Sequence, residues 1–282
     1  SQLGMFPEQY TEMMKKQREA KVNVIISNPP WYSRQEYENL GAKATKYENL
    51  DNHIRETYAK DSSATLVNSL YDGYIRAIRL ATNRIEEKGV SAFVTNSGFI
   101  DSNVADGLRK HLENDFAKIY ILNLRGNARL SGEAWKREGG KIFEQGSRAG
   151  VTLIMLIKDD SIEGPAEIYY HDIGDYLTRE EKLSRVIALK DLNNVPWELI
   201  KPNKHHDWIN QRDDRFDLFP SIGDKKSDTK EKVFTVHSLG LGSNRDAWVY
   251  NFSKTDLGEN INYLINNFNS HIELVQNGEI TS

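Results

Sequence analysis

Four consecutive residues, Asn28-Pro29-Pro30-Trp31, place an amide, two prolines and a large aromatic ring directly after an apolar run at residues 22–26. The apolar run predicts a buried strand. The four residues suit a rigid, exposed turn, because each proline fixes its own φ and favours extended geometry in the preceding residue. The Asn28 side-chain oxygen and the Pro29 carbonyl are hydrogen-bond acceptors, and an aromatic ring follows them. This combination suits a flipped nucleobase with an exocyclic amine.

The two prolines are also consistent with a plain strand end, since short motifs recur by chance. The chain after the motif bears on this choice. Strands are expected at residues 90–95 and 117–122, and helices at 61–88, capped by Asp61, and at 102–112. This alternation is typical of a parallel sheet, whose strands end at a common edge where ligands gather.

The remaining elements are less regular. An apolar run at residues 151–157 predicts a strong strand that pairs with residues 166–170, and Thr178 opens a helix with glutamates in its first turn. Proline, asparagine, histidine and aspartate accumulate from residue 192 to 232, which indicates a boundary. Beyond it we expect strands at 233–238 and 248–252 and a helix at 259–269.

The composition bounds the class of protein. The chain has 282 residues, 38% hydrophobic and 28% charged, with no cysteine and a net charge of −4. It has no secretory signal and no apolar run of about 20 residues, so we expect a cytoplasmic protein without a membrane span. The missing cysteine excludes disulfides and thiolate metal sites. The negative charge argues against a free-standing nucleic-acid binder but leaves room for contact through a local patch.

One segment, residues 125–150, concentrates positive charge in an otherwise acidic chain. It is rich in glycine and low in apolar residues, so we expect a surface loop. The loop either faces phosphates or is an ordinary flexible connection. Its basic residues are Arg125, Arg129, Lys136, Arg137, Lys141 and Arg148.

The tetrapeptide at residues 28–31 resembles motif IV of the amino-methyltransferases, in the form typical of adenine-N6 DNA methyltransferases. The resemblance implies that Asn28 and the Pro29 carbonyl hold the target amine, that Pro30 stiffens the turn and that Trp31 stacks on the base. Two acceptors on the amine favour lone-pair density on nitrogen as the methyl group arrives. This reaction uses S-adenosylmethionine and needs neither a metal nor a covalent enzyme intermediate.

Further stretches are similar to the single-polypeptide restriction–modification enzymes called type ISP, in which a helicase half precedes an adenine methyltransferase. They follow the family order from about residue 22 to the end. They include Gly89–Phe99, Asn123–Asn127, Gly139–Phe143, Arg148–Val151 and Asn244–Ser253, of which the last, with its Asn-Arg-Asp sequence, is fairly distinctive.

The type ISP resemblance implies an α/β fold, namely the part of a Rossmann-like methyltransferase sheet after the cofactor-binding half, with a smaller C-terminal α/β region. Residues 1–190 would hold the target-base half of the catalytic domain, and residues 191–282 the linker and the start of the target-recognition region. The implied partners are double-stranded DNA and the remainder of the parent polypeptide. That remainder comprises an upstream cofactor half with the helicase region and a downstream specificity domain.

The cofactor loop of this family, a glycine-rich turn after the first strand, has no counterpart before Val22. Gly139-Gly140 and Gly240-Leu241-Gly242 do not open a strand-to-helix turn of the required kind. We therefore expect a fragment that is inactive alone and binds S-adenosylmethionine poorly.

Several assignments beyond the motif stay open. Phe143 is a candidate for the second face of the base, although ordinary packing also accounts for it. Arg245 is a candidate for DNA contact or for anchoring the junction to the next domain. The loop Asn96-Ser97-Gly98 would face the same cleft as the motif or form a plain strand-to-helix turn. Adjacent His205 and His206 lack a third ligand at useful spacing, so we expect no metal site.

Two other functions fit the same residues. The four-residue motif also serves enzymes that methylate protein glutamine or RNA amines. Without a cofactor loop, the chain is also consistent with a non-catalytic module that engages DNA or has a structural role.

Overall fold

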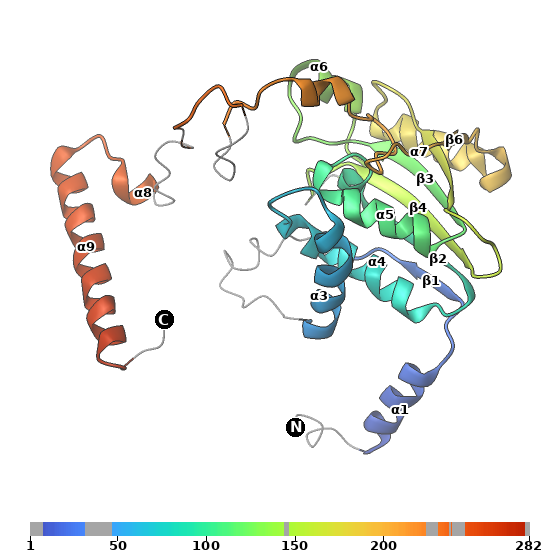
Figure 1. Cartoon of the computed structure of the whole chain (residues 1–282), viewed down its shortest axis with the longest axis horizontal. Coiled ribbons are helices and arrows are strands. Elements are labelled where there is room, and N and C mark those ends of the chain that lie inside the picture. Colours follow the sequence, from blue (N-terminus) through green and yellow to red (C-terminus); the bar gives the residue numbers. More distant parts are fainter. Residues whose placement is uncertain are drawn as a thin grey trace. The chain divides into compact units, whose positions relative to one another are not determined.

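The computed structural model describes residues 8–31, 47–143, 147–223, 231–236, 238 and 246–279 (Figure 1). The chain divides into two compact units, residues 1–213 and residues 214–282. Each unit is described by itself below.

A six-stranded mixed sheet forms the centre of the first unit, as the expected α/β fold requires. The strand order is β1-β2-β4-β3-β5-β6. The strands are β1 (Val24–Ser27), β2 (Lys88–Asn96), β3 (Lys118–Arg125), β4 (Val151–Asp159), β5 (Glu167–Asp172) and β6 (Glu198–Ile200).

The direction of the strands fixes where their ends lie. β1 pairs parallel with β2, and β3 pairs parallel with β5. β4 lies between β2 and β3 and is antiparallel to both, so β2 and β3 point the same way. The carboxyl ends of β1, β2, β3 and β5 therefore meet at one edge of the sheet, which we call the carboxyl edge.

The predicted pairing of residues 151–157 with 166–170 is wrong. Both sides of β4 are occupied by β2 and β3, so β5 adds to the free side of β3 instead. The prediction that β1 is buried is also wrong. Among the described residues, β1 pairs only with β2 and lies at the end of the strand order. The Val24 and Ile26 side chains are 63% and 82% exposed.

Helices cover the sheet and join its strands. α4 follows a short 3₁₀ turn at Asn68–Tyr71, and α5 follows another at Asn103–Ala105. The helices are α1 (Glu8–Glu19), α3 (Glu48–Ile54) with a π-helical turn at Arg55–Ala59, α4 (Gly73–Arg84), α5 (Asp106–Asp115), α6 (Gly132–Glu138), α7 (Arg179–Leu189), α8 (Asp246–Val249) and α9 (Lys254–Gln276). Further 3₁₀ turns are Ser97–Phe99, Leu192–Asn194 and Asp214–Leu218.

Two helix starts test the sequence signals. Thr178 caps α7 with a capping box, in which its side chain accepts from the Glu181 N–H and the Glu181 carboxylate accepts from the Thr178 N–H. The predicted start at Asp61 is wrong, because α4 begins only at Gly73. The Asp61 carboxylate instead accepts from Lys110 at 2.9 Å and contacts His111 at 3.1 Å on α5.

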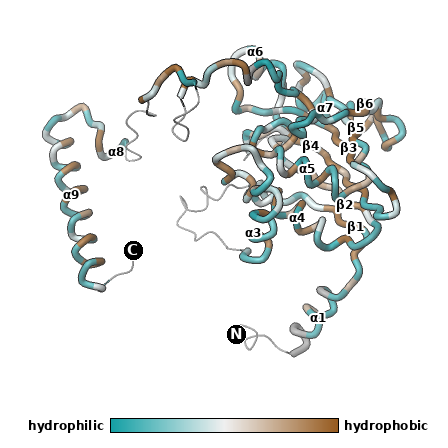
Figure 2. Tube along the Cα trace, viewed as in Figure 1, coloured by the Kyte–Doolittle hydropathy of each residue, from teal (hydrophilic) through white to brown (hydrophobic). Residues whose placement is uncertain are grey.

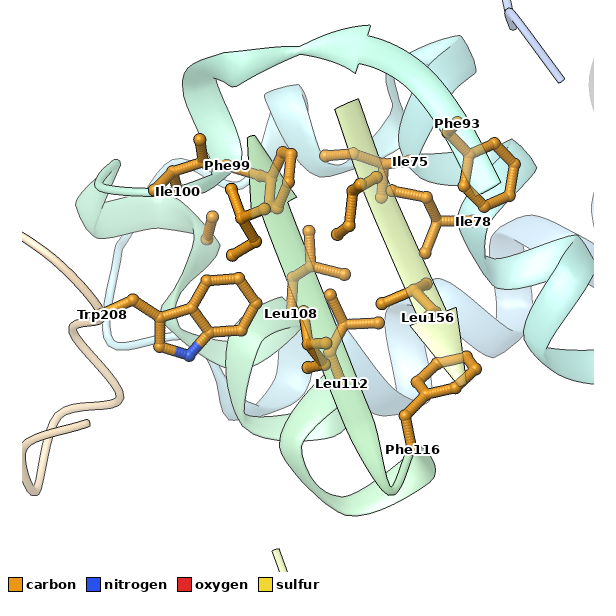
Figure 3. Close-up of a cluster of buried hydrophobic side chains, with 14 of the residues drawn as sticks. Ile75, Ile78, Phe93, Phe99, Ile100, Leu108, Leu112, Phe116, Leu156 and Trp208 are labelled. Carbon is orange, nitrogen blue, oxygen red and sulfur yellow. The ribbon is translucent and has the colours of Figure 1, made fainter. Parts of the chain in front are cut away.

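The main hydrophobic core lies between the sheet and helices α4 and α5 (Figure 3). Ile75 and Ile78 of α4 and Leu108 of α5 meet Phe93 of β2 and Leu156 of β4 there. The exposed fractions of these five side chains are 3% or less. A smaller cluster on the other face of the sheet joins Leu122 of β3 to the residues before α7.

The first compact unit continues to Asp213. Trp208 is buried in the main core, where its ring packs edge-on against Phe99 (Figure 3). The fully buried Arg109 of α5 donates to the carbonyl of His206 at 2.6 Å and to the Asp207 carboxylate at 3.2 Å. These contacts tie residues 203–212 to α5.

The second unit contains α8 and α9. The predicted strand at residues 248–252 is wrong, because Asp246–Val249 is a helical turn whose Trp248 stacks on Tyr263 of α9 at 5.6 Å between ring centroids. At 233–238, the described residues form no strand, and a single bridge joins Ser221 to Lys232. The predicted closing helix is confirmed and is longer than expected. α9 alternates apolar and polar positions along its length (Figure 2).

Over the described ranges, no helix combines the length and apolar character needed to cross a membrane.

Replacing Asp207 tests the connection between α5 and residues 203–212. The carboxylate binds Arg109 and also accepts from Arg212 at 2.8 and 2.9 Å. Asp207→Ala leaves the Arg109 guanidinium buried without its anion, so we expect the free energy of unfolding to fall by about 3–5 kcal/mol in urea titrations. The exposed Asp160→Ala should change it by less than about 0.5 kcal/mol.

The same comparison depends on pH. Burial alone would raise the pKa of Asp207, but hydrogen bonds from Arg212 and Asn203 hold that pKa well below its usual range. The stabilisation is therefore complete above the unfolded pKa and is lost as the pH falls below about 4. A difference between wild type and Asp207→Ala that stays constant down to pH 2 would contradict this assignment.

Candidate functional site

The Asn28–Trp31 turn leaves the carboxyl end of β1, as the sequence predicts. Asn28 and Pro30 are exposed, whereas Pro29 is buried. Trp31 is half-buried and packs against both hydrophobic clusters of the first unit. The turn is thus fixed by Pro29 and Trp31, while the Asn28 side chain is open to a ligand.

Gly73, the first residue of α4, packs closely against the Asn28–Trp31 turn. A Cβ atom at this position would lie 2.6 Å from the Pro30 carbonyl oxygen and 3.4 Å from Pro30 Cγ. The first value is shorter than any normal contact, so only glycine lets α4 approach the turn this closely. No local sequence pattern assigns this role to Gly73, because Pro30 lies 43 positions earlier in the chain.

Phe143 lies against Trp31, whereas the resemblance suggested that the two rings lie on opposite faces of one base. The ring centroids are 5.5 Å apart and the planes meet at 65°, an edge-to-face contact. Phe143 is 39% exposed. Trp31 Nε1 is buried and has no hydrogen-bond partner in the described part of the chain. In this structure the two rings contact one another and do not form two parallel walls.

The loop Asn96-Ser97-Gly98 lies at the same edge, where β2 ends. The Asn96 side-chain oxygen accepts from the Gly98 N–H at 2.8 Å, which closes the turn. The Ser97 N–H donates to the Gly150 carbonyl at 3.0 Å, so the loop is tied to the segment that leads into β4. This loop and the Asn28 turn leave adjacent parallel strands.

Arg125 ends β3 at the carboxyl edge in a left-handed conformation, with φ 56°. Its Nε donates to both Asp172 oxygens, at 2.6 and 2.9 Å, and its Nη1 binds Asp175. Both carboxylates come from β5 and the turn after it. Arg125, expected as a DNA contact, is thus engaged in an internal ion-pair network.

The other basic candidates occupy the segment after β3, which contains α6 and is not wholly a loop. Arg129, Arg137 and Arg148 are exposed, and Lys141 is half-buried. Arg148 also donates to the Ala128 carbonyl at 2.7 Å, and this hydrogen bond joins the two ends of the segment. Arg245 lies outside the described residues.

Two other parts of the first unit were considered as binding sites, an apolar cavity and the residues around His206. A cavity of about 350 Å³ on the sheet face that carries α7 is lined almost entirely by apolar side chains, among them Ile26, Leu153 and Trp197. The His206 ring contacts the Glu113 carboxylate at 2.8 Å, and the Asp207 carboxylate accepts a hydrogen bond from Arg109 at 3.2 Å. In the described part of the chain, no group of three histidines, cysteines or carboxylates is placed to hold a metal ion.

Comparison with known proteins adds to this geometry. Residues 232–280 match the family described as the type ISP C-terminal specificity domain. A solved structure of a nuclease-deletion mutant of the type ISP restriction–modification enzyme LlaGI, in complex with a DNA substrate mimic, is 41% identical over 97% of this chain, with a TM-score of 0.84. Over nearly its whole length, this chain is therefore similar to a part of type ISP restriction–modification enzymes.

Two further solved structures are similar to this chain over most of its length. The ATP-dependent type ISP enzyme LlaBIII bound to DNA is 38% identical over 93% of this chain, with a TM-score of 0.85. The DrdV–DNA complex is 35% identical over 92% of this chain, with a TM-score of 0.81. The chain spans 26%, 18% and 26% of the LlaGI, LlaBIII and DrdV chains. No curated protein matches the sequence.

The close approach of Gly73 to Pro30 can be tested with a single methyl group. Gly73→Ala forces α4 and the Asn28 turn apart, so we expect a loss of about 1–3 kcal/mol in unfolding free energy. Gly258 is a matched control in α9, because a Cβ there would meet nothing within 4 Å. Gly258→Ala should be neutral or stabilise by up to about 1 kcal/mol. Equal effects of the two substitutions in thermal melts would refute the steric argument.

Proposed function

We propose that this chain is the base-holding part of a DNA methyltransferase that transfers a methyl group from S-adenosylmethionine to adenine N6, within a type ISP restriction–modification enzyme. The observation that carries the proposal is the exposed Asn28 on a rigid turn at the carboxyl edge, next to the half-buried ring of Trp31. The similarity to type ISP enzymes supports the proposal that the chain is part of such an enzyme.

In this mechanism a flipped adenine lies with its amine at the turn. The Asn28 side-chain oxygen and the Pro29 carbonyl each accept one N–H of the amine, which favours lone-pair density on nitrogen. Burial of Pro29 holds its carbonyl in place, so the acceptors do not reorganise during the reaction. Trp31 stacks on the base, a contact worth about 1–3 kcal/mol in single-strand binders.

The methyl donor needs a separate site. In the described part of the chain, the parallel strands that lead into helices end in Asn-Pro-Pro at β1, Asn-Ser-Gly at β2, Arg-Gly-Asn at β3 and Asp-Ile-Gly at β5. None is the glycine-rich turn that cradles S-adenosylmethionine in this class, so these residues do not fit the cofactor by themselves. We propose that other parts of the parent polypeptide hold it, and that the chain alone is inactive.

DNA contact fits the basic segment after β3. Arg129, Arg137 and Arg148 are exposed on residues that follow the carboxyl edge. A flipped base at this edge brings its flanking phosphates to the same side of the sheet. With a net charge of −4, the chain would contribute a local set of phosphate contacts, and the rest of the parent enzyme would supply more. The segment that matches the specificity domain would begin the target-recognition region.

Replacing Asn28 in the intact parent enzyme tests the catalytic assignment. Asn28→Ala removes one acceptor of the amine, so we expect kcat for DNA methylation to fall by at least about 10²–10³-fold while DNA affinity is kept. Asn23→Ala, an exposed change at the other end of β1, should leave both unchanged. Near-normal methylation by Asn28→Ala, or methylation of glutamine peptides or RNA in preference to DNA, would overturn the proposal.

The salt dependence of DNA binding tests the basic segment. Each phosphate contact that is removed should flatten the plot of log affinity against log salt by about 0.9. We expect this for Arg129→Gln and for Arg137→Gln in the parent enzyme. Lys118→Gln, at the opposite end of β3, is the control and should not change the slope. Unchanged slopes for both arginine variants would place the DNA elsewhere.

A further inference from the structure

The segment Glu138–Phe143, which we call the strap, runs from the end of α6 to the ring that contacts Trp31. Its backbone lies unusually close to residues 177–179. A Cβ atom at Gly140 would lie 2.6 Å from the Arg179 nitrogen, and Gly139 has a left-handed φ of 68°. The Gly140 N–H donates to the Leu177 carbonyl at 2.9 Å. The glycines thus let the strap lie directly on the start of α7.

Two cations of α7 bind the backbone of the strap. Lys182 Nζ donates to the carbonyls of Glu138 and Gly140, both at 2.7 Å. Arg179 Nε donates to the carbonyl of Ile142 at 2.9 Å. The strap is therefore held at three of its carbonyls from one helix.

The burial of Lys182 shows that this arrangement is costly. Its side chain is fully buried, and burial lowers the pKa of its ammonium to about 8. The Glu138 and Asp172 carboxylates raise that pKa, and the Arg125 guanidinium lowers it. An apolar side chain would pack at this position without the desolvation penalty. What the ammonium adds is a pair of charge-assisted hydrogen bonds to the strap.

The strap ends at Phe143, next to Trp31, and these two rings form what we call the aromatic platform. Ile142 is buried in the smaller cluster with Leu122 and Leu177, and Trp31 packs against the same cluster. Phe143 follows directly and contacts the edge of the Trp31 ring at 5.5 Å. The position of the strap thus fixes one neighbour of the ring on which the base would stack.

We propose that Lys182 and Arg179 are positioning residues, which hold Phe143 against Trp31 and so set the plane of the aromatic platform. The role of that platform rests on the proposed function, whereas the contact itself does not. Neither residue touches a base in this arrangement; each acts through the strap.

The test observes Trp31 directly in the full 282-residue chain. The chain has five tryptophans, so incorporation of 5-fluorotryptophan gives five fluorine resonances, and Trp31→Phe identifies the one from Trp31. Phe143→Ala defines the shift expected when the edge contact is lost. We expect Lys182→Met and Arg179→Met each to move the Trp31 resonance toward that value. The other four resonances should stay in place.

Lys136→Met is the matched control, because it makes the same substitution at an exposed lysine of α6. It should leave the Trp31 resonance unchanged. An unmoved Trp31 resonance in the two α7 variants, or equal movement of all five resonances, would overturn the positioning role. If Lys182→Met fails to fold, Arg179→Met alone decides. Normal methylation by Asn28→Ala would sink the proposed function but leave this result intact.

Discussion

The common direction of β1, β2, β3 and β5 is the constraint on which the candidate site depends. β1 lies in register with β2 from Val24 opposite Val90 to Ser27 opposite Phe93. The Asn28 turn therefore leaves the sheet beside the last residues of β2. β4 enters the sheet where its neighbours leave it, which brings Gly150 next to Ser97. A slip of one residue in any pairing would turn every side chain to the other face and separate these loops.

Rigidity at this edge comes from close packing and needs few polar bonds. Pro29 is buried, Gly73 lets α4 touch Pro30, and Trp31 contacts two hydrophobic clusters. A turn fixed in this way holds the Asn28 backbone in place and leaves the Asn28 side chain exposed. Preorganised acceptors of this kind lose no free energy to reorientation as charge develops on the substrate.

The sequence predicted those features whose signals are local. The Asn28–Trp31 turn, the capping box of Thr178 and the alternation of strands and helices each depend on residues within a few positions of one another. The insertion of β4 between β2 and β3 could not be predicted, because an apolar run carries no information about its neighbours in the sheet.

Long-range partners explain the other differences. No local sequence pattern marks Lys182, because the carbonyls that it binds lie more than 40 positions earlier in the chain. Likewise, Arg109 binds Asp207 across 98 positions, and this contact ties the residues around Asp207 to the first unit. The contact of Phe143 with Trp31 was not predicted, since no local pattern joins two aromatic residues so far apart; the resemblance suggested only that Phe143 lies on the second face of the base.

The ion pairs of Arg125 also shape the charge of the carboxyl edge. Asp172 and Asp175 lie at the end of β5, beside the segment that carries Arg129 and Arg137. Unpaired, these carboxylates would oppose an approaching phosphate. The Arg125 guanidinium binds both, and its left-handed backbone is held by the hydrogen bond from its own N–H to the Asn123 side chain at 3.0 Å. In the proposed complex, Arg125 favours DNA by neutralising acidic groups, while the exposed arginines that follow it contact the phosphates.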